Sequence, residues 1–240
     1  TLELRAEFGP GILTAFIRIE GKPFGVIANN PRHLGGAIDA PAADKASRFM
    51  QLCDAFDIPL ISLCDSPGFM VGPEAEKTAL VRHACRMFVT ARSLTVPLFG
   101  VVLRKCYGLG AMGMIGGGTY NNAFTVAWPT GEFGPMGLEG AVTLGYRREL
   151  DAISDPVAKK ALYDRLLGEY YQQGKAISVA QTLEIDAVID PVDTRKWVLA
   201  GLRSTTPQGS GPATGGKGPQ ATGGKRPQAT GGKRPMVDPW

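Results

Sequence analysis

Residues 96–112 read VPLFGVVLRKCYGLGAM and hold the clearest strand-to-helix junction of the chain. The apolar run Val96–Leu103 predicts a short, buried strand. The segment 107–112, YGLGAM, follows it with three small residues and predicts the start of a helix. A helix that begins where a buried strand ends exposes unpaired backbone N–H groups and the positive end of its dipole. Such a corner can stabilise an oxyanion.

A second corner of the same kind lies upstream. Pro59–Cys64 predicts a buried strand, a loop with the sequence DSPGF follows at 65–69, and Glu74–Ala91 carries apolar residues at helical spacing. We expect Asp65 to cap the segment that comes after it.

The rest of the chain alternates in the same way. The other expected elements are a strand pair at Ile12–Glu20 and Phe24–Ala28, a helix at Ala42–Phe56, a strand at Ala123–Trp128, and mainly helix over Arg147–Arg203 with one short strand near Ala187–Ile189. Short strands that alternate with helices predict an α/β fold with a largely parallel sheet.

The glycines of the junction allow two interpretations. Gly108 and Gly110 have no side chain, so a ligand could approach the backbone closely there. The same absence of a side chain would let the helix pack tightly on the sheet. For one corner taken alone, tight packing is the default interpretation.

Composition and charge restrict the class of protein. The chain has 240 residues, 44% of them hydrophobic and 20% charged, which fits one globular domain with a sizeable core. The net charge of +4 arises from residues 204–240, where five bases face one acid, while residues 1–203 carry 21 of each. A neutral body gives no reason to expect nucleic acid or a membrane surface as a partner.

Residues 213–236 form a repeat with a period of eight: ATGGKGPQ, ATGGKRPQ and ATGGKRPM. Its Gly and Pro content resists regular structure, and it offers no apolar face to bury. We therefore predict one domain over residues 1–203, followed by a disordered Gly/Pro/Lys-rich tail over residues 204–240.

Metal and disulfide chemistry have little support. The four cysteines, at 53, 64, 85 and 106, form no CxxC pair, so reduced thiols in the cytoplasm are expected. Two histidines are too few for a multi-histidine metal site, and no metal is expected. No signal peptide is visible, and the longest apolar run has about half the ~20 residues that a membrane-spanning helix needs.

Side-chain catalysts are also scarce. No GxSxG motif frames Ser62 or Ser66, and His83 is expected to be a partly buried structural residue rather than a base. Three glycines at 116–118 lack the Lys-Ser/Thr of a phosphate-binding loop. The remaining site is rich in backbone donors and poor in acids and bases. It suits a reaction whose reactants supply their own base and need charge stabilisation as an enolate forms.

Seven motifs, in order along the chain, resemble those of the biotin-dependent acyl-CoA carboxyltransferases. They are GVIANNP (25–31), CDAFDIPL (53–60), DSPGF with a glycine at 72 (65–72), VRH (81–83), RKCYG (104–108), AWPT (127–130) and MGLEGAV (136–142). The resemblance runs from about residue 9 to 200 and concerns only the C-terminal half of the family's transferase unit.

The resemblance implies a crotonase-like α/β fold built of repeated ββα units, with helices packed on the sheet. In the family, an N-terminal half binds acyl-CoA and a C-terminal half mainly binds carboxybiotin. The active site lies between the two halves of different subunits, which implies an oligomer. The implied cofactor is biotin, carried as carboxybiotin by a biotin carboxyl carrier protein and loaded by a biotin carboxylase. Release of CO2 leaves the biotin nitrogen N1 as the base, and the resulting enolate captures CO2.

The resemblance also implies roles for residues of the junction. The backbone N–H groups of Leu109 and Gly110 would form an oxyanion hole for the urea oxygen of biotin. The residues implied in substrate binding are Gly68, Phe69, Tyr107, Gly108, Ala111 and Met112. Short-chain carboxylases carry an aromatic residue and then an acidic or β-branched residue where this chain has Ala111 and Met112, so a different acyl length is expected.

Three functions remain open from the sequence. The first is transfer of a carboxyl group from carboxybiotin to acetyl-, propionyl- or a longer acyl-CoA. The second is a biotin-dependent acyl-CoA decarboxylase, which uses the same half-reactions in reverse. The third is a non-catalytic assembly module.

Overall fold

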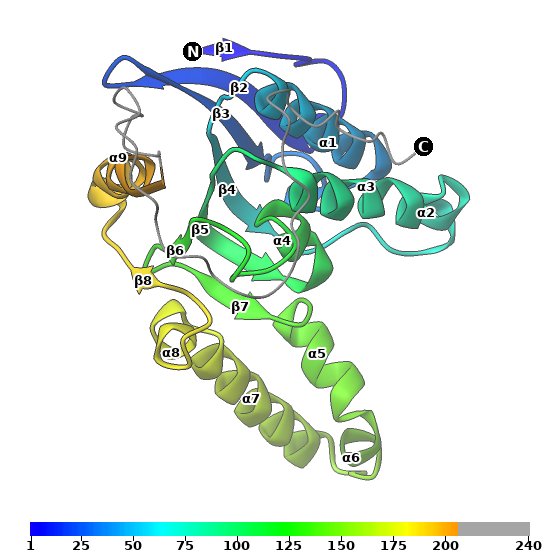
Figure 1. The fold of residues 1–240 in the computed structure, drawn as a ribbon. Helices are drawn as coiled ribbons and strands as arrows, with labels where there is room; N and C mark the ends of the chain where they lie inside the picture. Colours follow the sequence, from blue (N-terminus) through cyan, green and yellow to red (C-terminus); the bar gives the residue numbers. More distant parts are fainter. Residues whose placement is uncertain (206–240) are drawn as a thin grey trace, which may run out of the picture.

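The computed structural model describes residues 1–205 and contains a mixed eight-stranded sheet (Figure 1). The strand order is β1-β2-β3-β4-β5-β6-β8, and β7 pairs with β5. The strands are β1 (Leu2–Glu3), β2 (Ile12–Ile19), β3 (Lys22–Asn29), β4 (Leu60–Ser66), β5 (Leu98–Tyr107), β6 (Phe124–Ala127), β7 (Glu132–Gly134) and β8 (Ala187–Val188). The first three strands pair antiparallel, and all pairs from β3–β4 onward are parallel.

Helices lie on both faces of the sheet and also extend away from it. They are α1 (Ala40–Ala55), α2 (Pro73–Lys77), α3 (Leu80–Ser93), α4 (Gly108–Met114), α5 (Leu138–Gly145), α6 (Arg147–Asp151), α7 (Pro156–Gln173), α8 (Ala176–Gln181) and α9 (Thr194–Thr205). Short 3-10 turns lie at Leu34–Gly36 and Pro191–Asp193. Figure 1 shows α5, α6 and α7 as an arm that projects from the edge of the sheet.

Two apolar clusters hold the helices on the sheet. Residues of α1, α3 and α4 pack on one face, and α9 contributes Val198 to the other. Side chains along β5 alternate between the clusters: Leu98 and Val102 belong to the first, and Phe99 and Val101 to the second. Because both faces are covered, β5 is apolar throughout its first half, as expected of a parallel strand.

The predicted alternation of strands and helices is confirmed; two expected elements differ in extent, and strands β1 and β7 were not expected. The helix expected over Glu74–Ala91 is two helices, because Ala79 has φ of +56° and interrupts the helical path between α2 and α3. Strand β5 continues past Leu103 to Tyr107, because its polar end finds partners in β4 and β7.

The predicted tail lies outside the described residues, apart from its first two, Ser204 and Thr205, which end α9. The core of the described residues extends to Val198 and Leu199, which are buried in α9. We therefore expect truncation after Thr205 to shift Tm by less than about 2 °C in scanning calorimetry. A fall of ten degrees would mean that the repeats stabilise the domain.

Candidate active site

The two corners chosen from the sequence lie against each other. A Cβ atom added to Gly110 would stand 2.4 Å from the carbonyl carbon of Gly68 and 2.7 Å from the backbone nitrogen of Phe69. Only glycine permits this approach of two backbones. The packing interpretation therefore holds for Gly110, and this packing brings the loop after β4 against the first turn of α4.

Gly108 has a different reason to be glycine. Its φ is +56°, and a Cβ atom there would stand 2.7 Å from the carbonyl oxygen of Pro135. The side chain of the preceding residue, Tyr107, makes no capping hydrogen bond to the helix start. The first N–H groups of a helix have no partner within the helix, so the N–H of Leu109 stands at a helix start that no side chain caps.

A cavity of about 530 Å³ opens beside this helix start. Four predicted site residues line it, namely Gly108, Leu109, Ala111 and Met112. The other lining residues come from α4 and the segment after it, β5, β7, α5, α7, α8 and their loops: Cys106, Ile115, Thr119, Phe133, Gly134, Pro135, Leu138, Tyr170, Gln173, Gly174, Val179 and Glu184. Most of these are apolar, so the cavity suits an apolar or neutral group.

The other predicted site residues do not line the cavity. Gly110 and Tyr107 are buried, and Gly68 and Phe69 support α4 from the side of β4. The sequence analysis missed the contributions of β7, α7 and α8, such as Phe133, because they lie far along the chain and carry no motif.

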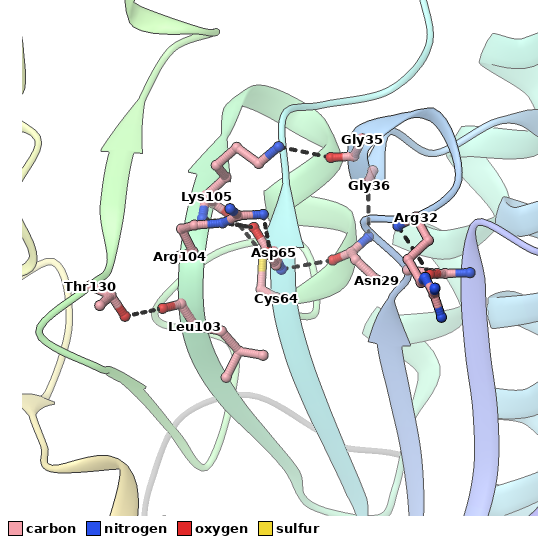
Figure 2. Close-up of polar contacts among 11 residues, drawn as sticks. Asn29, Arg32, Gly35, Gly36, Cys64, Asp65, Leu103, Arg104, Lys105 and Thr130 are labelled. Carbon is pink, nitrogen blue, oxygen red and sulfur yellow. Dashed lines mark hydrogen bonds and ion pairs between the residues drawn. The ribbon is translucent and has the colours of Figure 1, made fainter.

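Asp65 does not cap a helix, contrary to the sequence-based expectation. Its carboxylate accepts hydrogen bonds from Arg104 Nε at 3.2 Å, Arg104 Nη2 at 3.1 Å and the backbone N–H of Lys105 at 3.1 Å (Figure 2). The next helix, α2, begins after Gly72 without a side-chain cap. The partner of Asp65 is thus the neighbouring strand β5, which a local sequence pattern does not reveal.

Two further side chains join this polar network. Asn29, at the end of β3, accepts the N–H of Asp65 through Oδ1 at 3.0 Å and donates to the carbonyl of Gly36 at 3.3 Å. Lys105 donates through Nζ to the carbonyl of Gly35 at 2.8 Å. The carboxyl ends of β3, β4 and β5 are therefore tied to one another and to the turn at Leu34–Gly36 (Figure 2).

Two cysteines lie at or behind the wall of the cavity. Cys106 lines the cavity with Cys64 behind it, and a hydrogen bond between the two thiols together with burial raises the pKa of Cys64. Cys64 therefore stays protonated near neutral pH. His83 bonds to Asp44 through Nδ1 at 2.9 Å and does not line the cavity, which agrees with the structural role predicted for it.

Within residues 1–205, no three His, Cys, Asp or Glu side chains gather in a way that could hold a metal ion. In the same part of the chain, no helix has both the length and the apolar character needed to cross a membrane.

An uncapped helix start beside an apolar cavity, on a mixed sheet covered by helices, is the arrangement that the resemblance to the carboxyltransferases implied. The chain belongs to the carboxyl transferase domain family of the biotin-dependent acyl-CoA carboxylases, whose model matches residues 2–208. The resemblance inferred from the motifs is thereby confirmed.

Curated relatives are similar over most of this chain. It is 37% identical over 201 residues to the carboxyltransferase subunit of propionyl-CoA carboxylase from Haloferax mediterranei. It is 38% identical over 202 residues to the methylmalonyl-CoA carboxyltransferase 12S subunit of Propionibacterium freudenreichii subsp. shermanii. These matches cover 83% and 84% of this chain but only 38% of either relative, so the chain corresponds to a part of them.

Solved structures support the same fold. A single-chain, multi-domain long-chain acyl-CoA carboxylase is 57% identical, with a TM-score of 0.75 over 83% of this chain and 19% of that chain. The transcarboxylase 12S hexamer, solved with methylmalonyl-coenzyme A, is 35% identical, with a TM-score of 0.78 over 90% of this chain and 41% of that chain. The crotonase-like α/β fold expected from the resemblance is confirmed.

Proposed function

We propose that this chain is the carboxybiotin-side half of an acyl-CoA carboxyltransferase, and that it helps to move a carboxyl group from carboxybiotin to an acyl-CoA. Family membership supports this reaction class. The observation that carries the proposal is the uncapped start of α4 beside a cavity of about 530 Å³. This arrangement offers backbone donors to a developing negative charge and has no metal-ligating cluster in the described chain.

The residues at the cavity fit a neutral bicyclic urea such as biotin. Apolar side chains, among them Ile115, Leu138 and Val179, would contact the ring, and the N–H of Leu109 would donate to its carbonyl oxygen. Gly110 does not line the cavity, so its N–H is the more deeply placed of the two proposed donors. Carboxybiotin, delivered by a carrier protein, supplies the carboxyl group and a basic nitrogen, so the chain needs no base of its own.

We propose that the partners are those of the family: a biotin carboxyl carrier protein, a biotin carboxylase and an acyl-CoA-binding half from a neighbouring subunit. The transcarboxylase relative forms a hexamer, which supports an oligomer here. Relatives named for propionyl-CoA, long-chain acyl-CoA and geranyl-CoA show that the acyl group varies within the family.

The acyl group proposed for this chain is longer than propionyl. Ala111 and Met112 line the same cavity as the residues proposed to contact the biotin ring, and the small side chain of Ala111 leaves room there for the end of an acyl chain held by the neighbouring half. The 57% identity to a long-chain acyl-CoA carboxylase supports the same assignment. Each additional buried methylene is worth about 0.8 kcal/mol, so kcat/KM should rise about fourfold per methylene until the cavity is filled.

The test measures kcat/KM for acetyl-, propionyl-, octanoyl- and palmitoyl-CoA in the complete enzyme, reconstituted with its acyl-CoA-binding half. We expect Met112→Phe to lower the value for palmitoyl-CoA about tenfold more than for propionyl-CoA, because the larger ring narrows the cavity. Met136→Phe is the matched control, since Met136 is similarly exposed (41%, against 37% for Met112) but does not line the cavity. A preference for acetyl-CoA would contradict the assignment.

A further inference from the structure

We propose that Asp65 is a positioning residue for carboxyl transfer: its carboxylate fixes an irregularity at the end of β5 and thereby sets the place of the first turn of α4. The inference deepens the function proposed above and rests on it. Asp65 itself does not line the cavity, so it would act through the backbone of β5.

The pairing of β4 with β5 is irregular where Asp65 lies. Cys64 stands opposite Val102, but Ser66 stands opposite Cys106, so two steps along β4 correspond to four along β5. The extra residues of β5 cannot all find ladder partners on β4. Bulges of this kind re-aim the chain and are common beside active sites.

The carboxylate of Asp65 fills this irregularity. It is 7% exposed and accepts the N–H of Lys105, a residue of β5 for which β4 supplies no opposite residue in the ladder. The same carboxylate accepts two N–H groups of Arg104, so both residues of β5 that precede Cys106 are bound to it. Charge-assisted, two-pronged bonds of this type fix geometry more strictly than a neutral contact.

The backbone of Asp65 is itself held in place. Its N–H donates to Oδ1 of Asn29, whose Nδ2 donates to Gly36, so β3 supports the residue from the other side. A Cβ atom on Gly36 would stand 2.4 Å from the carbonyl oxygen of Asp65, which shows how closely the turn at Leu34–Gly36 covers it. The carboxylate therefore has little freedom to move with β5.

These bonds affect the position of the proposed oxyanion hole at the start of α4. Lys105 precedes Leu109 by four residues, and between them Cys106 and Tyr107 pair with β7. Asp65 holds the end of β5 on one side and β7 holds it on the other. Because α4 follows directly from this strand end, the position of its first turn is fixed as well. Loss of the Asp65 bonds would free the irregular segment and shift the N–H groups of α4.

Asp54 provides a matched control at the opposite end of β5. It is 6% exposed, and its carboxylate accepts the backbone N–H groups of Thr95 at 2.7 Å and Val96 at 3.1 Å and the hydroxyl of Thr95 at 2.9 Å. Both carboxylates are buried and accept hydrogen bonds from backbone N–H groups. Only Asp65, however, lies at the end of β5 that leads into α4.

The first experiment compares Asp65→Asn with Asp54→Asn in the complete enzyme. An amide at position 65 puts an N–H₂ group in the place of Oδ2, so the negative charge and the bond from Arg104 Nη2 are lost while the volume is kept. The bonds from Arg104 Nε and the Lys105 N–H to Oδ1 lose their charge assistance. We expect kcat to fall about 10²-fold with little change in the KM for acyl-CoA, because misplacement of a catalytic group by about 1 Å has that effect. Asp54→Asn likewise removes a buried charge, keeps Oδ1 as the acceptor of its three bonds, and should keep kcat within about threefold of wild type.

The second experiment uses the present chain by itself and measures amide hydrogen exchange. Exchange at residues 112–115, whose N–H groups bond back to the first turn of α4, should accelerate at least tenfold in Asp65→Asn and stay unchanged in Asp54→Asn. Should Asp65→Asn fail to fold, Arg104→Met takes its place, because Arg104 is exposed and its loss removes two of the three bonds to the carboxylate.

Two results would overturn the inference. One is an equal fall of kcat in both aspartate variants once the folded fraction is taken into account, and the other is unchanged exchange at residues 112–115 of the Asp65 variant. A wild-type complete enzyme without transfer activity would instead refute the proposed function, and the exchange measurement would still decide whether Asp65 positions α4.

Discussion

Purified alone, the chain is expected to transfer no carboxyl group to any acyl-CoA, even when free carboxybiotin is supplied, and addition of the complementary acyl-CoA-binding half is expected to restore turnover. The chain spans only 38% of the length of the curated relatives that it matches. Holding two reactants in place can be worth an effective concentration of about 10⁵ M, so a missing half-site should lower the rate below detection.

The surface of the chain agrees with a missing partner. Apolar side chains are exposed along the arm and the segment after it, namely Leu144, Val157, Ile177 and Leu183. Large apolar side chains exposed over this part of the chain fit a surface that another chain covers. The cavity also lies between the arm and α4, so a partner that contacts the arm would stand close to the reacting groups.

The measurement is formation of labelled carboxyacyl-CoA by each half alone and by the two halves together. The acyl-CoA-binding half alone serves as the control for residual transfer. Robust turnover by the 240 residues alone would show that the site is complete within this chain, and the proposal of a half-site would be wrong.

Most of the fold was predictable because the elements that build it are local. Runs such as Val96–Leu103 are apolar on both faces, as expected of a strand that is covered on both sides. The interruption at Ala79 was not predictable, because alanine favours helix and nothing in its neighbours indicates a positive φ. Strand β7 was missed for a similar reason: its three residues exist as a strand only because the end of β5 pairs with them.

The site likewise has one part that the local sequence predicts and one part that it does not. The small residues of the junction, Gly108 to Met112, mark it locally, and four of them do line the cavity. The opposite wall comes from Tyr170, Gln173 and Val179, which are brought there by the arm and α8. Only tertiary packing places those residues at the cavity, and no spacing in the sequence predicts that position. Asp65 shows the same limit, since its partners lie 39 and 40 residues further along the chain.

The oxyanion corner itself is tested by Leu109→Pro, which is expected to lower kcat about 10²- to 10³-fold in the complete enzyme. Proline removes the backbone N–H proposed to hold the oxyanion, and loss of one such donor has this effect in enzymes that stabilise charge with backbone groups. Leu109 is the second residue of α4, and proline is tolerated in the first turn of a helix, where the N–H has no helical partner.

Leu109→Ala is the matched control, because it keeps the N–H and removes a side chain that is 69% exposed. Circular dichroism and Tm must first show that both variants are folded, since proline also restricts the backbone of the residue before it, Gly108. The decisive quantity is the single-turnover rate of transfer from carboxybiotin at equal folded fraction. A purely structural role of Leu109 predicts that each variant loses activity only in proportion to its loss of stability. Equal rates in the two folded variants would mean that this N–H stabilises no developing charge, and the oxyanion hole would then have to be sought elsewhere along the cavity.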